Sequence, residues 1–210
     1  SIFGSELHKI SGTRENSTIE AKIFSKKNNI PYLSHNLSPY FSEGMKSFAY
    51  EINEAIGPID HIIFPTGNGS LLLGTWRGFL DISEKTNFNL PKLHAAQSNA
   101  IEPIVAKFNN SDWTFDSTKT TVASGISVSK PPRLQEIVDV IKESKGTALS
   151  STDDEALKWH KILAKEEGIF SEKTCAFSFS ALEKLVAKGV IKKDEKIIIP
   201  ITGSGLKEAI

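Results

Sequence analysis

Two glycine-containing segments of the chain have residue types that could hold a small anionic or heteroaromatic ligand. The first follows a short apolar run and reads Gly67, Asn68, Gly69, Ser70 and Leu71. Glycine can adopt positive φ and lets the backbone approach a ligand closely. Ser70 precedes a leucine-rich stretch of helical character, so we expect it to be the helix N-cap. Because the N–H groups of a helix N-terminus attract phosphate, the segment predicts either an anion site or a plain connecting turn.

The loop around Gly67 and Gly69 differs from two better-known phosphate motifs. It lacks the Gly-Lys-Ser/Thr ending of the nucleoside triphosphate P-loop, and no third glycine completes a dinucleotide fingerprint. If the loop binds an anion, we therefore expect a monophosphate group.

The second segment, Thr202-Gly203-Ser204-Gly205, follows an apolar run at residues 196–201. In open α/β sheets, ligands bind beyond the carboxyl ends of the strands, so we expect both segments to face one site. The Thr202 hydroxyl at a strand end has two open interpretations: it could hydrogen-bond a ring nitrogen, or it could satisfy a turn.

Composition narrows the class of ligand. The 210 residues, 39% of them hydrophobic, suffice for one large domain or a large and a small one. Lys and Arg number 25, as do Asp and Glu, and this zero net charge argues against a nucleic-acid or membrane partner. Arginine occurs only at positions 14, 77 and 133. Bidentate clamps are therefore scarce, and an anion site must depend on backbone amides.

Cysteine and histidine give no sign of redox or metal chemistry. Cys175 is the only cysteine, and a small buried residue is favoured there over a catalytic thiol. The five histidines include no pair at metal-ligand spacing, so we expect no metal. Without a signal peptide or a long apolar run, a cytoplasmic location is expected.

Apolar runs alternate with amphipathic segments, which predicts a three-layer α/β/α fold around a mostly parallel sheet. The expected strands are residues 6–10, 31–34, 61–65, 92–97, 146–150 and 196–201. The expected helices are residues 15–27, 42–56, 71–80, 134–143, 153–167 and 175–188. Residues 109–121 should form an exposed loop. We expect residues 1–50 to belong to an incomplete smaller domain and residues 51–210 to a large ligand-binding domain.

Five segments, in this order, resemble threonine synthase within the tryptophan-synthase-β-like, fold type II class of pyridoxal phosphate enzymes. They are residues 34–52, 67–71, 121–126, 168–172 and 201–207. The resemblance implies that residues 67–71 cradle the cofactor phosphate, that Thr202 hydrogen-bonds the pyridine nitrogen, and that residues 123–126 lie close to the ring. It also implies conversion of O-phosphohomoserine and water to threonine and phosphate. A hydroxyl partner would not keep the ring nitrogen protonated, so the cofactor ring would be a weaker electron sink than a protonated ring.

The sequence departs from this family in its lysine. The family's Schiff-base lysine lies in a Ser-Phe-Lys-Asp-Arg type motif, and no lysine of this sequence has that context. The chain starts at Ser1 without methionine, and we expect it to be the C-terminal part of a longer protein. We thus assign no catalytic residue, and expect these residues alone to be inactive and to bind the cofactor weakly without a covalent bond.

A second departure concerns the substrate. Many threonine synthases have Asn-Pro-Phe-Arg where this chain has Ser38-Pro-Tyr-Phe41, and an aromatic ring cannot replace a guanidinium. We expect His35, Asn36 and Ser38 to contact a small amino-acid substrate, whereas Lys46 fits a solvated helix lysine better. A related β-replacement enzyme or dehydratase, such as cysteate synthase, stays open, as do a lysine-free ligand-binding remnant and a homodimer.

Overall fold

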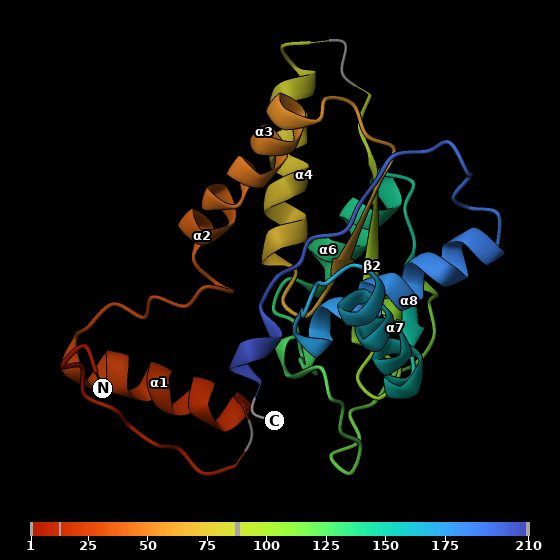
Figure 1. The fold of residues 1–210 in the computed structure, drawn as a ribbon. Helices are drawn as coiled ribbons and strands as arrows, with labels where there is room; N and C mark the ends of the chain where they lie inside the picture. Colours follow the sequence, from red (N-terminus) through yellow and green to blue (C-terminus); the bar gives the residue numbers. More distant parts are fainter. Residues whose placement is uncertain (1, 13, 87–88, 209–210) are drawn as a thin grey trace. The chain divides into compact units, whose positions relative to one another are not determined.

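The computed structural model describes residues 2–12, 14–86 and 89–208, which divide into two compact units, Ser1–Ser38 and Pro39–Ile210. Among its described residues the first unit has a single helix, α1 (Arg14–Asn28). The second unit contains the sheet and the other helices (Figure 1). The boundary between the two compact units falls after Ser38 in the sequence, and the predicted division into domains at residue 50 stays a prediction.

A four-stranded, fully parallel sheet forms the centre of the second unit. Its strands are β1 (His61–Pro65), β2 (Lys92–Ser98), β3 (Ala148–Ser151) and β4 (Ile197–Ile198), in the order β3-β2-β1-β4. The ladder pairs His61 with Lys92 on one side of β1 and with Ile197 on the other. All strands are joined by crossovers that contain helices, so the predicted α/β fold with a parallel sheet is confirmed.

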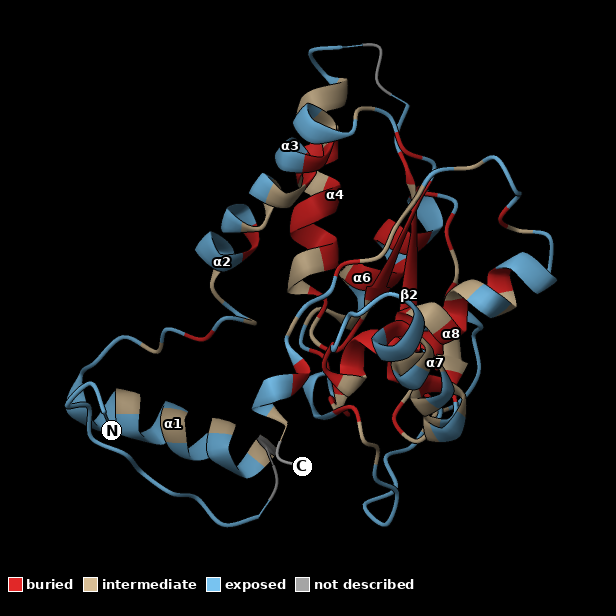
Figure 2. Ribbon diagram, viewed as in Figure 1, coloured by how far each residue is buried: buried red, intermediate tan, exposed pale blue. Residues whose placement is uncertain are grey.

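Side chains of β1 alternate between two apolar layers. Ile62 and Phe64 belong to one buried cluster, and Ile63 belongs to the other. The first cluster includes residues of α3 (Lys46–Ala55), α4 (Ser70–Ser83), α5 (Pro103–Phe108) and α6 (Leu134–Glu143). The second includes residues of α7 (Asp153–Glu166) and α8 (Lys173–Ala187). Helices thus cover both faces, and the buried residues concentrate between them (Figure 2).

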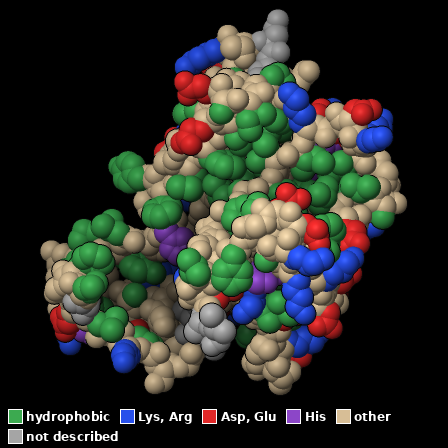
Figure 3. All heavy atoms as spheres, viewed as in Figure 1, with side chains coloured by type: hydrophobic (Ala, Val, Ile, Leu, Met, Phe, Trp, Pro, Cys, Tyr) green, Lys and Arg blue, Asp and Glu red, His purple; other side chains and the backbone are tan. Residues whose placement is uncertain are grey.

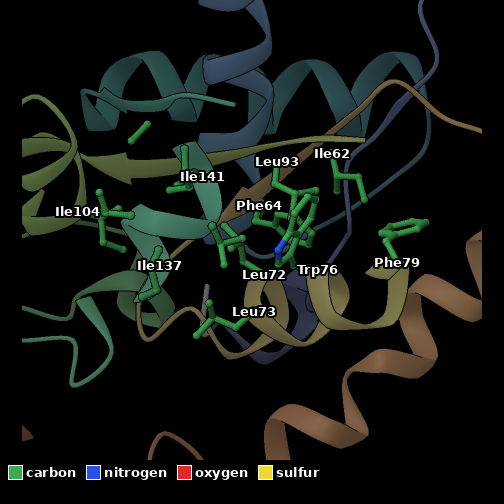
Figure 4. Packing of buried hydrophobic residues seen from close by; sticks show 14 of the residues in the cluster. Ile62, Phe64, Leu72, Leu73, Trp76, Phe79, Leu93, Ile104, Ile137 and Ile141 are labelled. Atoms are coloured by element: carbon green, nitrogen blue, oxygen red, sulfur yellow. The ribbon is translucent and has the colours of Figure 1, made fainter. Parts of the chain in front are cut away.

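The larger cluster fixes α4 against the sheet. Phe64 and Leu93 from the strands pack with Leu72, Trp76 and Phe79 from α4, all at most 3% exposed (Figure 4). Each fully buried side chain of this kind contributes about 1.5–3 kcal/mol to burial free energy. The start of α4 therefore rests on a rigid platform.

Most of the predicted elements are present within two or three residues of their expected bounds, and α6 matches the prediction at both ends. Residues 42–56 are an exception, because they form two helices, α2 (Pro39–Gly44) and α3. Gly44 ends α2, as expected from the low helix propensity of glycine. The six-residue α5, which begins with Pro103, was not predicted.

Three strand predictions were wrong in whole or in part. Residues 6–10 and 31–34 are not in strands, because no described segment of the first unit pairs with them. Only Ile197 and Ile198 of the predicted 196–201 strand join the ladder. Pro200, which has no N–H to donate, follows soon after this pair. Residues 109–121 lie in an exposed loop, as predicted.

The first unit buries little of its own apolar surface. In α1, Ile19 is 56% exposed, Ile23 is 53% exposed and Phe24 is 42% exposed. Figure 3 shows hydrophobic side chains open on this unit. A cavity of about 370 Å³ lies within it, lined by α1 together with His8, Ile10 and Ile30. Throughout the described residues, no helix has the length and apolar character needed to span a membrane.

Candidate functional site

The predicted phosphate loop follows β1 and is tied to the neighbouring strand β2. The backbone N–H of Thr66 donates to the carbonyl of Ala96 at 2.9 Å. The buried side chain of Gln97 then donates from Nε2 to the Thr66 carbonyl at 3.1 Å. Its Oε1 accepts from the backbone N–H of Ile104, at the start of α5, at 2.9 Å. Gln97 therefore fixes where the loop leaves the sheet, a role that the sequence analysis missed.

Gly69, and not Ser70, is the N-cap of α4. Its φ of +75° lies in the left-handed region, and no side chain makes a capping hydrogen bond to this helix start. Ser70 is the first helical residue, so its prediction as N-cap was wrong. A Cβ at Gly69 would lie 2.4 Å from Ile137 Cδ1 of α6, so a glycine is required both for conformation and for space. No side-chain cap therefore competes with a phosphate for the backbone N–H groups at this helix start.

A second loop packs directly on the phosphate loop. A Cβ at Gly67 would lie 3.1 Å from the carbonyl oxygen of Gly125, within the short helix η1 (Ser124–Ile126). Asp153, the first residue of α7, holds the segment before η1: its carboxylate accepts from Thr121 Oγ1 at 2.7 Å and from the Val122 N–H at 2.9 Å. The segment predicted to lie near a cofactor ring is thus anchored beside the phosphate loop.

Thr202 lies beyond the end of β4, next to the start of α8. Thr66 and Thr202 each lie four residues after the Ile62–Ile198 pair of the ladder, so their loops leave adjacent strands on the same edge of the sheet. The Thr202 hydroxyl donates to Glu172 Oε1 at 2.7 Å, and its N–H donates to Cys175 Sγ at 3.2 Å. The Thr202 residue itself is exposed.

Cys175 is buried, as expected, but it also serves this site. Besides accepting from the Thr202 N–H, its sulfur lies 3.3 Å from Thr202 Oγ1. Neither Glu172 nor Cys175 was assigned a role from sequence. Glu172 could have been considered from sequence, because it ends segment 168–172, one of the five segments that resemble the family.

Three buried hydroxyls in α8 or just before it lack hydrogen-bond partners among the described residues. Within the described part of the chain, the side-chain oxygens of Ser171, Thr174 and Ser178 are buried and have no hydrogen-bond partner. Thr174 Oγ1 would lie 3.0 Å from a Cβ placed on Gly125, so it belongs to the same group of loops. Buried polar groups without partners are rare and are typical of sites that receive a ligand. The uncapped start of α4 and these unsatisfied hydroxyls suit a phosphate-bearing cofactor, and the assignment of residues 67–71 and Thr202 to it stays a prediction.

The predicted substrate residues His35, Asn36 and Ser38 lie in the first unit. They follow a local turn in which the Ser38 N–H donates to the Ser34 carbonyl at 2.8 Å and Ser34 Oγ donates to Asn36 Oδ1. The role of these three residues stays a prediction, since they and the phosphate loop belong to different units.

Two cationic residues that could have replaced the missing arginine are engaged elsewhere. Lys46 pairs with Glu43 at 2.9 Å and Asp81 at 3.0 Å, and these carboxylates raise its pKa, with Glu43 contributing most. Arg77 pairs with Glu136 at 2.7 Å and with Glu43 at 3.2 Å. No group of three or more potential metal ligands exists among the described residues.

Comparison with known proteins identifies the family to which the chain belongs. The profile of the family described as "Pyridoxal-phosphate dependent enzyme" matches residues 1–203. The threonine synthase of Methanocaldococcus jannaschii is 32% identical over 99% of this chain and 52% of its own length. The threonine synthase of Halalkalibacterium halodurans is 30% identical over 99% of the chain and 57% of its own length. The chain thus spans about half the length of these curated relatives.

Solved structures of a deaminase and a racemase share the fold. Threonine deaminase isoform 2 from Solanum lycopersicum superposes with a TM-score of 0.78 at 17% identity, covering 97% of this chain and 54% of that one. Maize serine racemase gives a TM-score of 0.77 at 15% identity, covering 97% of this chain and 60% of that one. At these identities the likeness concerns fold alone.

Proposed function

Because the chain belongs to the family of pyridoxal-phosphate dependent enzymes, we propose that it forms part of a threonine synthase-like carbon-oxygen lyase. The substrate would be O-phosphohomoserine, and the products threonine and phosphate. The observation that carries the proposal is the 32% identity with a threonine synthase along 99% of the chain. The likeness to threonine deaminase and serine racemase structures, by contrast, lies at or below 22% identity.

Each end of the proposed cofactor site has its own residues. Gly67, Asn68, Gly69, Ser70 and Leu71 would hold the phosphate through the open start of α4, where charge-assisted hydrogen bonds contribute roughly 1.5–3 kcal/mol each. Thr202 would orient the ring through its nitrogen. Bound pyridoxal phosphate would supply an electron sink for the bond changes of the substrate.

The remaining parts of the proposal follow from the sequence. His35, Asn36 and Ser38 would orient the substrate, and the Schiff-base lysine would come from outside these 210 residues, since none of their lysines has the family context. We further propose residues 1–50 as part of a smaller domain, residues 51–210 as the cofactor domain, a cytoplasmic location and a homodimer.

One observation favours a second candidate, a related β-replacement enzyme or dehydratase such as cysteate synthase. Phe41 occupies the position of the family's substrate-phosphate arginine, and it lies 48% exposed in α2. Arg77, on the neighbouring α4, is held by two glutamates and does not compensate. A dehydratase substrate such as serine has no phosphate group and would not need that arginine, so the replacement by Phe41 favours a dehydratase within this candidate class.

The test uses the parent protein that contains this sequence. With pyridoxal phosphate bound, it should release equimolar phosphate and threonine from O-phosphohomoserine. Cofactor binding without turnover of O-phosphohomoserine, combined with turnover of serine or another β-substituted amino acid, would establish the second candidate instead.

A separate test concerns the 210-residue chain. Titration with pyridoxal phosphate should show weak binding, and borohydride reduction followed by peptide mass spectrometry should find no stoichiometric lysine adduct. A single fully modified lysine would refute the proposal that the Schiff-base lysine lies elsewhere.

A further inference from the structure

Another cavity lies in the second unit and contains none of the residues assigned to the cofactor or the substrate. Its volume is about 680 Å³, and it is lined by α5, by the loop that follows α5, by residues 129–131 and by Leu134 at the start of α6. Small-molecule sites have volumes of roughly 300–1,000 Å³. The cavity is therefore large enough for a ligand of its own.

A short segment of chain separates this cavity from the phosphate loop. A Cβ at Gly67 would lie 3.1 Å from the Gly125 carbonyl oxygen and 3.0 Å from Val128 Cγ2. The next residues along the chain, Ser129 and Pro131, are buried and line the cavity. The two sites are thus neighbours that share no residue, and this wall of the cavity is part of the packed fold.

Hydrogen bonds at the end of α5 fix where the lining loop begins. The Ser111 N–H donates to the Ala106 carbonyl at 2.9 Å, and Ser111 Oγ donates to the same oxygen at 3.2 Å. Asn110, between them, has a φ of +54°, a conformation that asparagine adopts more readily than most residues. Residues 111–115 therefore leave α5 in a defined direction.

Two aromatic side chains of this loop line the cavity. The ring centroids of Trp113 and Phe115 lie 6.4 Å apart, with their planes inclined at 46°. Trp113 is half-buried and Phe115 is 40% exposed, so neither ring is covered by the protein alone. Covering such surfaces with a flat apolar group removes them from water, and aromatic rings favour a planar partner.

The charged residues that line the cavity are all positive. Lys107 and Lys130 line it, and no Asp or Glu does so among the described residues. In the part of the chain that the structure describes, neither ammonium group has a hydrogen-bond or ion-pair partner. The acidic residues of the loop, Asp112 and Asp116, are not in the lining, and Asp116 accepts from Thr118 Oγ1 at 2.6 Å. An anionic group in the cavity would thus meet two unpaired ammonium groups.

We propose that this cavity is a binding site for a small planar aromatic anion, whose ring packs against Trp113 and Phe115 and whose negative group pairs with Lys107 and Lys130. A neutral aromatic ligand would leave both ammonium groups without a partner. An inorganic anion alone would leave both rings uncovered. The inference goes beyond the proposed function and does not depend on the cofactor.

The test uses 2-naphthoate, a planar aromatic carboxylate without the phosphate group that residues 67–71 are proposed to hold. Isothermal titration calorimetry with the full chain should show one site with a dissociation constant below about 1 mM. Naphthalene-2-carboxamide has the same rings without the charge, and cyclohexanecarboxylate has the charge without a flat ring. Each should bind about tenfold more weakly than 2-naphthoate.

NMR signals of the indole N–H groups locate the probe. The chain has tryptophans at positions 76, 113 and 159. Trp76 is 3% exposed, and Trp159 Nε1 donates to Glu183 at 2.7 Å. The Trp113 signal, assigned by its loss in Trp113→Phe, should shift when 2-naphthoate is added, whereas the other two should not. Binding that leaves the Trp113 signal in place would overturn the assignment to this cavity.

Charge variants test the two lysines separately from the rings. The double variant Lys107→Gln, Lys130→Gln should bind 2-naphthoate about tenfold more weakly and bind the carboxamide as before, because only charge has been removed. Trp113→Leu should weaken both probes about fivefold. Lys119→Gln, in the same loop but outside the lining, is the control and should change neither affinity. Circular dichroism checks that each variant is folded.

The possible results separate this inference from the proposed function. Equal affinities for 2-naphthoate and its amide, or the same loss in Lys119→Gln as in the double variant, would overturn it. So would the absence of binding, or a Trp113 signal that responds to protein concentration but not to the probe, which would indicate a contact between copies of the chain. If 2-naphthoate binds as expected but pyridoxal phosphate does not bind, the cofactor assignment fails and this inference stands.

Discussion

The two ends of the parallel sheet use buried polar groups in opposite ways. At the carboxyl end, the hydroxyls of Ser171 and Thr174 are buried without partners among the described residues, and Thr202 is exposed. At the amino end, His61 and His94 are fully buried and bond to each other. The carboxyl end has hydrogen-bonding groups left for a ligand, whereas the histidines of the amino end bond mainly to each other.

The amino-end network has a defined direction. The Thr147 N–H donates to His94 Nδ1 at 3.1 Å, so neutral His94 carries its proton on Nε2. That proton faces His61 Nδ1 at 2.8 Å, and His61 in turn carries its proton on Nε2. His61 Nε2 lies 3.2 Å from Glu195 Oε2 but makes no aligned hydrogen bond to it.

The amino end of the sheet contributes to the stability of the fold, whereas the carboxyl end has groups available for ligand binding. The His61–His94–Thr147 hydrogen bonds join buried groups to one another and stabilise the fold, and the buried imidazoles make this network sensitive to an added proton. A set of hydroxyls and backbone amides without protein partners costs stability until a ligand satisfies it. We therefore expect ligand binding to respond to changes at the carboxyl end, and acid stability to respond to changes at the amino end.

The largest expected effect comes from Gly69→Ala at the phosphate loop. The new Cβ would meet Ile137 at 2.4 Å, and its residue must keep a φ of +75°. Overpacking and left-handed strain together should lower the free energy of unfolding by about 3 kcal/mol. Pyridoxal phosphate affinity should fall at least tenfold, measured by fluorescence titration alongside urea denaturation.

Gly189→Ala is the matched control for this change. Its φ is +67°, and a Cβ there would meet no atom within 4 Å. It should therefore lose only about 1 kcal/mol of stability through left-handed strain and keep its cofactor affinity. If both alanine variants bound the cofactor equally well, the phosphate would not sit in the loop at Gly69.

Acid should weaken the amino end by the next largest amount. Burial lowers the pKa of His94 from 6.5 to about 3, and burial also lowers the pKa of His61. Between these pH values the unfolded chain binds more protons than the folded one, so stability is complete above pH 6.5 and declines as the pH falls. From pH 7 to pH 5, His94 alone should cost about 2 kcal/mol.

The measurement is the urea midpoint as a function of pH for the wild type and His94→Gln. The variant should be less stable at pH 7 but lose less stability on acidification, since one of the two buried imidazoles is gone. Parallel pH curves would show that the histidine network does not carry the acid sensitivity. Cofactor affinity at pH 7 should be equal in both proteins.

Sequence reasoning predicted one part of this contrast and missed the other. The glycines at 67 and 69 and the threonine at 202 could be identified because a ligand-binding loop needs particular backbone freedom and particular atoms at a strand end. The histidines were judged by metal-ligand spacing along the chain. Their pairing arises from strand register, in which His94 lies opposite Ile63, and single-sequence spacing does not contain it.

The missed parts of the carboxyl end have the same cause. Glu172 reaches Thr202 across 30 positions of sequence, and Gln97 reaches Thr66 across 31. Such contacts depend on which strands become neighbours. The strands predicted at residues 6–10 and 31–34 failed for a related reason, since an extended apolar run becomes a strand only when another segment pairs with it.

A moderate effect is expected from Gln97→Leu, which removes the tie between the phosphate loop and α5. The Thr66 carbonyl and the N–H groups of Ile104 and Val105 would lose their partner. Leaving buried groups unpaired costs roughly 1–3 kcal/mol, and we expect about 1.5 kcal/mol here because space opens for water. Cofactor affinity should fall about threefold.

A second variant at position 97 tests which of the two hydrogen bonds of Gln97 supports cofactor binding. Gln97→Glu keeps the acceptor for α5 but loses the donor to Thr66, so it should affect cofactor affinity at least as much as Gln97→Leu. If both variants lost stability but kept their cofactor affinity, Gln97 would stabilise the fold without supporting cofactor binding.

The smallest effect should come from Thr152→Ala at the start of α7. Thr152 and Glu155 form a capping box, whose loss costs about 1 kcal/mol. The next residue, Asp153, anchors the segment that leads to η1, and its bonds to Thr121 and Val122 do not involve the cap. Thermal unfolding should therefore shift while cofactor affinity changes less than twofold. An affinity loss equal to that of Asp153→Asn would mean that the cap holds the loop, and the ligand-responsive end of the sheet would then extend to α7.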